Sequence, residues 1–155
     1  MPKCIILVGV PASGKSTWHL NKFGDWPTTV ASTDKIIESV TQIYGMSYDE
    51  GFKGLIQFAE QIMWRQITTC LMNRGDFIID RTNLTAKSRA KFIQKLKLHK
   101  YNIECLVFPT PEPEEWKRRL DSRRGKTIPQ EVLDRMVASY EVPTEAEGFD
   151  KITFM

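Results

Sequence analysis

The run GVPASGKST at residues 9–17 constrains the fold more than any other part of this 155-residue chain. It matches the pattern Gly-x-x-x-x-Gly-Lys-Ser/Thr, in which a glycine-rich loop turns successive backbone N–H groups toward phosphate oxygens. The pattern indicates phosphate binding when it lies between a strand and a helix. Here an apolar run at 3–8 precedes it, and a helix-compatible segment begins at Lys15. The sequence therefore predicts a P-loop with a phosphate site at a helix N-terminus.

The residue types of this loop each suit that chemistry. Glycine permits the tight backbone curvature at positions 9 and 14. The Lys15 ammonium can bridge the β- and γ-phosphates of ATP or another nucleoside triphosphate, and the Ser16 hydroxyl can ligate Mg²⁺. We therefore expect ATP as phosphate donor and Mg²⁺ as cofactor. The nucleotide-binding residues expected in the loop are Gly9, Ala12, Ser13, Gly14, Lys15, Ser16 and Thr17.

Apolar runs and helix-compatible segments alternate along the rest of the chain. Strands are expected at 3–8, 28–32, 76–80, 103–108 and 149–154, helices from 15, from 33 and over 52–73, 85–99, 114–123 and 129–140, and a loop at 44–54. This order predicts an α/β P-loop NTPase fold, with a mostly parallel central sheet of about five strands and helices on both faces. We expect one domain over residues 1–155, with ligands bound at the carboxyl ends of the strands.

Two acidic residues follow predicted strands. Asp80 ends an apolar strand and is expected to hold Mg²⁺, although a strand-end carboxylate can also simply begin a turn. Asp34 comes just after the second strand, on the acceptor side of the phosphates, where it can take a proton from an attacking hydroxyl. Its alternative role is to cap the next helix, a task that Ser32 or Thr33 can also perform. The position at a strand end favours catalysis.

Basic residues gather in two segments. Residues 117–128 contain the break Arg124-Gly125-Lys126-Thr127 between two helices and are expected to form a lid. Arg123 and Arg124 on this lid are expected to bind nucleotide and to stabilise charge on the transferred phosphoryl group. Residues 87–100 carry six further basic residues and no carboxylate, which is equally typical of a phosphate-facing surface and of a solvated helix face.

Bulk properties exclude several other classes. Cys4, Cys70 and Cys105 are scattered and lack C-x-x-C spacing, which indicates reduced thiols and a cytoplasmic setting and gives no indication of a zinc site. The apolar runs are far shorter than the roughly 20 residues of a membrane span, and no secretion signal is visible. The net charge of +3 is too small to diagnose a polyanionic partner, and the oligomeric state stays open.

Several stretches together resemble the kinase domain of phage-type polynucleotide 5′-hydroxyl kinases. They are GVPASGKSTW from Gly9, IIDRTNL from Ile78 and RRGK from Arg123, and the resemblance covers most of the chain. It implies transfer of the γ-phosphoryl group of ATP to the 5′-hydroxyl of a DNA or RNA end, in the cytoplasm, including that of a phage-infected host. The catalytic residues that it implies are Lys15, Asp34 and Arg124. We expect Thr82 and Asn83 of the turn after Asp80, together with Arg81, to bind the acceptor.

The chain departs from that family at two positions. Ile37 stands where the phage type has an acceptor-binding arginine, and Arg81 stands where it has an acid. We expect Arg81 to supply the acceptor-phosphate contact that Ile37 cannot. No Asp-x-Asp motif follows, so 3′-phosphatase activity is not expected. Two alternatives stay open: a kinase of the same fold acting on a nucleoside, sugar or antibiotic, and a non-catalytic nucleotide-binding or RNA-binding module.

Overall fold

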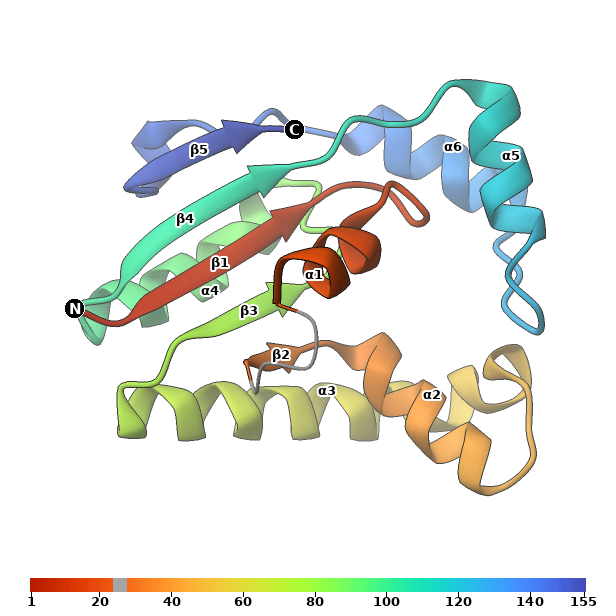
Figure 1. Ribbon diagram of the computed structural model, residues 1–155, viewed down its shortest axis with the longest axis horizontal. Helices are drawn as coiled ribbons and strands as arrows, with labels where there is room; N and C mark the ends of the chain where they lie inside the picture. The colour runs from red at the N-terminus through yellow and green to blue at the C-terminus, as the bar shows by residue number, and fades with distance from the viewer. Residues whose placement is uncertain (24–27) are drawn as a thin grey trace.

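A computed structural model describes residues 1–23 and 28–155 (Figure 1). Its elements, in chain order, are β1 (Lys3–Val8), α1 (Lys15–Phe23), β2 (Thr29–Ala31), α2 (Thr33–Ile43), α3 (Tyr48–Asn73), β3 (Phe77–Asp80), α4 (Ala86–Leu98), β4 (Asn102–Val107), α5 (Pro113–Asp121), α6 (Gln130–Ser139), the 3-10 turn η1 (Glu145–Glu147) and β5 (Lys151–Phe154).

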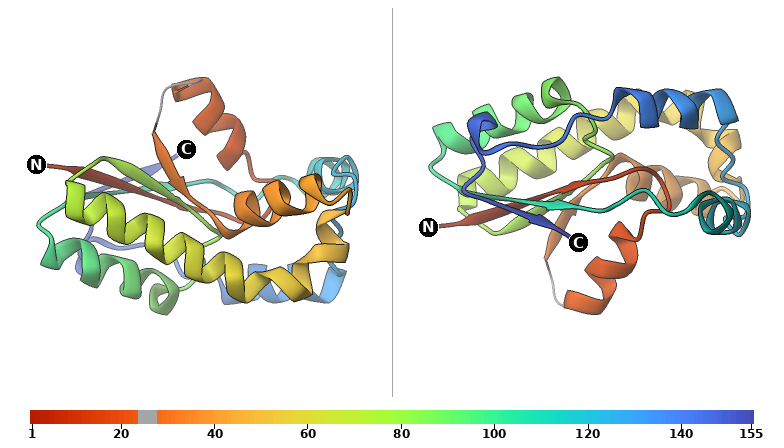
Figure 2. Two further views of the ribbon diagram at one scale, coloured as in Figure 1. Left: turned by 90° about the horizontal axis from the view of Figure 1, so that it is seen from below. Right: turned by 90° about the horizontal axis from the view of Figure 1, so that it is seen from above.

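The strands form one parallel five-stranded sheet in the order β2-β3-β1-β4-β5. Helix α1 covers one face, and α3 and α4 cover the other (Figure 2). This confirms the predicted fold class. The P-loop, α2 and α5 all lie beyond the carboxyl ends of the strands, which are the arrowheads in Figure 1. None of the helices in the described part of the chain is long and apolar enough to span a membrane.

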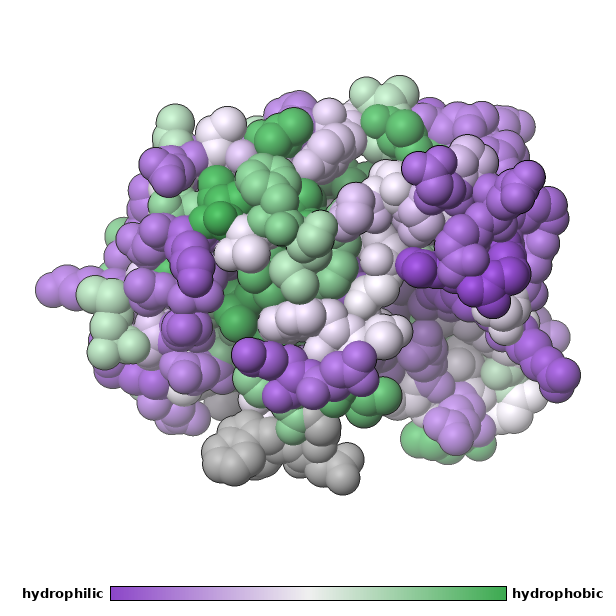
Figure 3. All heavy atoms as spheres, turned by 45° about the horizontal axis from the view of Figure 1, so that its top comes forward, coloured by the Kyte–Doolittle hydropathy of each residue, from purple (hydrophilic) through white to green (hydrophobic). Residues whose placement is uncertain are grey.

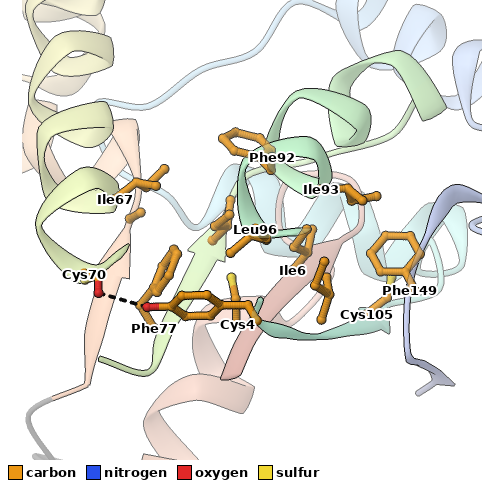
Figure 4. Close-up of a cluster of buried hydrophobic side chains, with 14 of the residues drawn as sticks. Cys4, Ile6, Ile67, Cys70, Phe77, Phe92, Ile93, Leu96, Cys105 and Phe149 are labelled. Atoms are coloured by element: carbon orange, nitrogen blue, oxygen red, sulfur yellow. Dashed lines mark hydrogen bonds between the residues drawn. The ribbon is translucent and has the colours of Figure 1, made fainter. Parts of the chain in front are cut away.

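The main core lies between the sheet and the pair α3–α4 (Figure 4). Alternate β1 residues, among them Cys4 and Ile6, pack in one cluster with Phe92 and Leu96 of α4. Each of these four side chains is at most 1% exposed. Each large apolar side chain buried in this way stabilises the fold by about 1.5–3 kcal/mol. The three cysteines are buried free thiols, as their spacing predicts. This core fixes the strand ends that carry the polar site.

The long helix α3 begins earlier than its apolar periodicity predicts. Residues 48–54 were expected in a loop, but the helix starts at Tyr48 with a capping box, in which Ser47 and Glu50 each bond the other's backbone N–H. The glycine at 51 allows close contact with α2, since a Cβ there would lie 2.3 Å from Thr41 Cγ2. Helix packing thus offsets the low helix propensity of glycine.

Candidate functional site

A cleft of about 840 Å³ opens at the carboxyl ends of the strands. It receives side chains from the P-loop, from the starts of α1 and α2, from the end of β3 and from the lid, residues 117–128. Figure 3 shows strongly hydrophilic residues gathered at the end of the molecule where α5 lies. The predicted site residues that line the cleft are Ala12, Ser13, Gly14, Lys15, Ser16, Thr17, Asp34, Asp80, Arg81, Thr82 and Arg123.

The P-loop is folded around the Lys15 ammonium. Its Nζ donates to the carbonyl oxygens of Gly9 and Val10, both at 2.8 Å. Burial lowers the pKa of Lys15 to about 8, although the negative charges of Asp80 and Asp34 oppose the shift. Gly9 is needed because a Cβ there would lie 2.6 Å from Ser13 Oγ. The loop therefore holds a cation ready for a phosphate.

The Asp34 carboxylate has a partner on each oxygen. Tyr48 Oη donates to Oδ1 at 2.6 Å, and Lys126 Nζ donates to Oδ2 at 3.0 Å. Burial raises the pKa of Asp34, but the charge of Lys126 and these two hydrogen bonds outweigh it, so that the pKa is lowered. The helix cap is Ser32, whose Oγ accepts from the backbone N–H of Lys35 at 3.3 Å. Asp34 is therefore left to face the cleft.

Asp80 lies on the neighbouring strand, where it pairs in register with Leu7 of β1. Burial raises its pKa, and the charges of Lys15 and Lys35 counter that effect. The Asp80 carboxylate and the Ser16 hydroxyl line the same cleft and are hard oxygen ligands of the kind Mg²⁺ prefers. Within residues 1–23 and 28–155, no group of three or more His, Cys, Asp or Glu side chains could hold a metal alone.

The lid tip is docked on the start of α3. The backbone N–H of Thr127 donates to both Asp49 carboxylate oxygens, at 2.8 and 3.0 Å, and the backbone N–H of Asp49 donates to Gly125 O at 2.9 Å. Gly125 has φ +68°, and a Cβ there would lie 2.8 Å from Ser47 Cβ. The lid thereby spans the cleft from the P-loop side to α3.

The structure does not bring Arg124 to the cleft. Arg124 is exposed and lies outside the cleft lining, whereas its neighbour Arg123 lines the cleft and has a buried Nη1 with no hydrogen-bond partner in the described chain. Arg119 also lines the cleft and donates to Ala12 O at 3.3 Å. Of the two adjacent arginines, the turn docked at Gly125 therefore brings only Arg123 to the cleft.

Asn83, too, lies outside the cleft lining. Asn83 is buried, with φ +48°, and its amide donates to Leu7 O at 2.8 Å. Its own carbonyl accepts from Arg89 Nη1 at 2.9 Å. The role of Asn83 is therefore structural, tying the turn after β3 to β1. Arg81 and Thr82 of the same turn line the cleft, and Arg81 forms an ion pair with Glu60 at 2.7 Å.

Three side chains at the site were missed or assigned other roles from sequence. Tyr48 fell in the expected loop. Trp116 lay in the helix expected over 114–123, and its Nε1 donates to Pro11 O of the P-loop at 2.8 Å. Lys126 was only one member of a basic cluster. Its partner Asp34 lies 92 residues away, so no local pattern could connect the two.

Comparison with known proteins identifies relatives of this chain in sequence and in fold. A family model described as "AAA domain" matches residues 4–143. Heterogeneous nuclear ribonucleoprotein U-like protein 2 of Mus musculus is 26% identical over 97% of this chain, which spans only 21% of that relative's length. Human heterogeneous nuclear ribonucleoprotein U-like protein 2 matches at 25% identity over the same share.

Solved structures show the same fold. A protein from Chloroflexus aurantiacus assigned as a kinase superposes with a TM-score of 0.73, at 17% identity over 99% of this chain and 84% of its own. The Pnkp1/Rnl/Hen1 complex gives a TM-score of 0.53, at 26% identity over 76% of this chain and 38% of that one. The chain thus shares the fold of these structures.

Proposed function

Because the chain belongs to the AAA domain family and has the fold of P-loop kinases, we propose that it transfers the γ-phosphoryl group of ATP, or another nucleoside triphosphate, to the 5′-hydroxyl of a DNA or RNA end. One observation carries the proposal: Lys15 of the P-loop and the carboxylate of Asp34 line a single cleft. A loop that only binds nucleotide needs no carboxylate on its acceptor side. A kinase needs one to take the proton of the attacking hydroxyl.

In the proposed reaction, Asp34 accepts the proton of the 5′-hydroxyl while its oxygen attacks the γ-phosphorus in line. The P-loop N–H groups and Lys15 hold the β- and γ-phosphates, and Arg123 stabilises the charge that develops on the transferred group. A bound phosphate also favours the charged form of Lys15, whose pKa burial has lowered to about 8. Positioning and charge stabilisation provide most of the rate.

Magnesium fits the oxygen ligands of this cleft. Ser16 and Asp80 would hold the ion, with phosphate oxygens and water completing its shell, which agrees with the small number of protein ligands here. When bound, Mg²⁺ supplies neutralisation of the negative charge on the phosphates. A cation beside Asp80 also offsets the burial that raises its pKa.

Two arginines support an anionic substrate. Arg81 and Arg123 line the cleft, and each has a buried Nη1 atom without a hydrogen-bond partner in the described chain. A guanidinium group in this state is suited to phosphate oxygens. Arg123 faces the donor side in our proposal, and Arg81 contacts a phosphate of the acceptor strand.

A small-molecule acceptor is the second candidate, and α2 favours it. Ile37 is completely buried, so it offers nothing to a substrate, and the cleft-lining residue at the next position is Glu38. A carboxylate repels an acceptor phosphate but accepts hydrogen bonds from hydroxyl groups. This arrangement suits a nucleoside or sugar, and it makes the acceptor class an experimental question.

Radiolabel transfer from γ-labelled ATP tests the proposal. Purified protein is incubated with 5′-OH DNA and RNA oligonucleotides and, separately, with nucleosides and sugars. We expect label on the oligonucleotides, its loss in Lys15→Ala and Asp34→Ala, and no change in Lys151→Ala, an exposed lysine at the start of β5. Label on a nucleoside or sugar alone would establish the second candidate. Tight RNA binding without transfer would instead indicate a non-catalytic module, and full activity in Asp34→Ala would refute the role of Asp34.

A further inference from the structure

The two partners of Asp34 come from distant parts of the chain and differ in how firmly they are held. Tyr48 is the first residue of α3, and Lys126 lies in the lid. The Tyr48 ring contacts Phe52, with centroids 5.6 Å apart, and the Lys126 ammonium lies 4.3 Å from the centroid of the Tyr48 ring. The capping box just before Tyr48 and the close contact of α2 with α3 fix the hydroxyl relative to Asp34.

Lys126 has a second carboxylate within reach. Its Nζ donates to Glu38 Oε1 at 2.9 Å as well as to Asp34 Oδ2 at 3.0 Å. It can therefore leave Asp34 and stay paired with Glu38, one helical turn further along α2. The Tyr48 hydroxyl has no such second acceptor among its hydrogen bonds in the described chain. One oxygen of Asp34 is thus held by a fixed donor, and the other by a donor that can be exchanged.

A general base needs a free lone pair aimed at the proton that it takes. Resting on the kinase function proposed above, we propose that Tyr48 is a positioning residue for Asp34, which holds Oδ1 so that Oδ2 serves as the base, and that Lys126 covers Oδ2 until the acceptor hydroxyl replaces it. The hydroxyl proton then passes to Oδ2 as the hydroxyl oxygen bonds the γ-phosphorus. The bond from that phosphorus to the bridging oxygen breaks, and its electron pair leaves with ADP.

The charges around Asp34 determine what the loss of Tyr48 would do. The charged groups that face it from α1, α2, β3 and the lid are Lys15, Lys35, Glu38, Asp80, Arg123 and Lys126. Burial raises the pKa of Asp34, and the hydrogen bond from Tyr48 is one of the contributions that lower it. Asp34 must be deprotonated to act as a base. Removal of the hydroxyl therefore moves the acidic limb of the pH–rate profile to higher pH.

Tyr48→Phe tests the positioning role, because it removes only the hydroxyl and keeps the ring contacts. We expect kcat to fall about tenfold, which corresponds to the free energy of one hydrogen bond to a charged group. The KM for ATP should stay unchanged, and the acidic limb of the pH–rate profile should lie at higher pH. The matched control is Tyr44→Phe, since Tyr44 is 74% exposed, and it should retain wild-type kinetics. A wild-type pH profile and kcat in Tyr48→Phe would overturn the assignment of Tyr48.

Lys126→Met tests the exchangeable donor. Since no ammonium group then has to be displaced, the KM for the acceptor should fall two- to fivefold. This factor corresponds to roughly the free energy of an ion pair with exposed partners. An increase in that KM would show that Lys126 binds the acceptor, and would overturn its role as an occupant of Oδ2. Both variants should keep the circular dichroism spectrum of the wild type.

A substrate-free measurement separates this inference from the proposed function. Carbon-13 NMR follows the titration of the Asp34 carboxyl in the free protein, with Asp34→Asn to assign the signal. The pKa should rise in Tyr48→Phe and stay at the wild-type value in Tyr44→Phe. If no acceptor is ever phosphorylated but this shift appears, the proposed function fails while the Tyr48–Asp34 contact stands. If the titration does not move, the inference fails even in an active kinase.

Discussion

Glu147→Gln should destabilise the protein strongly, because Glu147 neutralises a completely buried arginine. Arg89 is 0% exposed, and its Nε and Nη2 each donate to a Glu147 carboxylate oxygen at 2.8 Å. Removing the charge of one partner in a buried ion pair lowers the free energy of unfolding by about 3–5 kcal/mol. The side chain of Glu147 is 15% exposed, so water can partly replace it, and we expect a loss of about 2–4 kcal/mol. For a chain of this length that corresponds to a Tm lower by roughly 5–15 °C.

Urea unfolding and calorimetry of Glu147→Gln, Arg89→Met and the double variant measure this effect. The double variant should be less destabilised than the sum of the two single variants, by about 1–3 kcal/mol, since it leaves no unpaired charge. Hydrogen bonds from Arg89 lower the pKa of Glu147 from its ordinary 4.5. The stabilisation is therefore present above that value and lost as the pH falls through the folded-state pKa. A loss below about 0.5 kcal/mol in Glu147→Gln would refute the reasoning.

Three further predictions concern the site. ATP binding should weaken as the pH rises through 8, since Lys15 then loses its proton. Calorimetry above pH 8, in buffers of different ionisation enthalpy, should therefore detect the uptake of a proton by Lys15 when ATP binds. Gly125→Ala should lower the free energy of unfolding by about 1–3 kcal/mol and speed proteolysis of the lid, because the residue has φ +68° and its Cβ would meet Ser47. An unchanged cleavage rate would contradict the docking of the lid on α3. EDTA should abolish phosphoryl transfer, and Asp80→Asn should raise the Mg²⁺ concentration that restores it; an unchanged requirement would exclude Asp80 as a ligand.

Features encoded by neighbouring residues could be predicted from the sequence. The strand, loop and helix around Lys15 follow from residue order and glycine chemistry, and the alternation of strands and helices leads to a parallel sheet. The start of α3 was encoded too, in the capping pair Ser47 and Glu50. Glycines at 51 and 54 obscured it, because the contact that compensates for Gly51 is with Thr41 of another helix.

Side-chain directions and long-range contacts could not be predicted. Resemblance to a family gives positions, but whether Arg123 or Arg124 faces the cleft depends on one turn docked on α3. Asn83 shares a motif with cleft residues, yet its left-handed backbone turns the amide toward β1. The partners of Asp34 come from positions 48 and 126, and only the folded sheet brings them together.

The two loops that carry Lys15 and Asp80 are bonded directly to each other. The Gly9 N–H donates to Thr82 O at 3.0 Å, and the Asn83 amide donates to Leu7 O at 2.8 Å, so both loops move as one piece of the sheet. Much of the proposed acceptor side is assembled differently, from α2 and the start of α3. Substitutions in these two segments leave both of the bonds between the loops in place. In the proposed kinase, this separation would allow one acceptor to replace another during evolution while the use of the nucleotide stays the same.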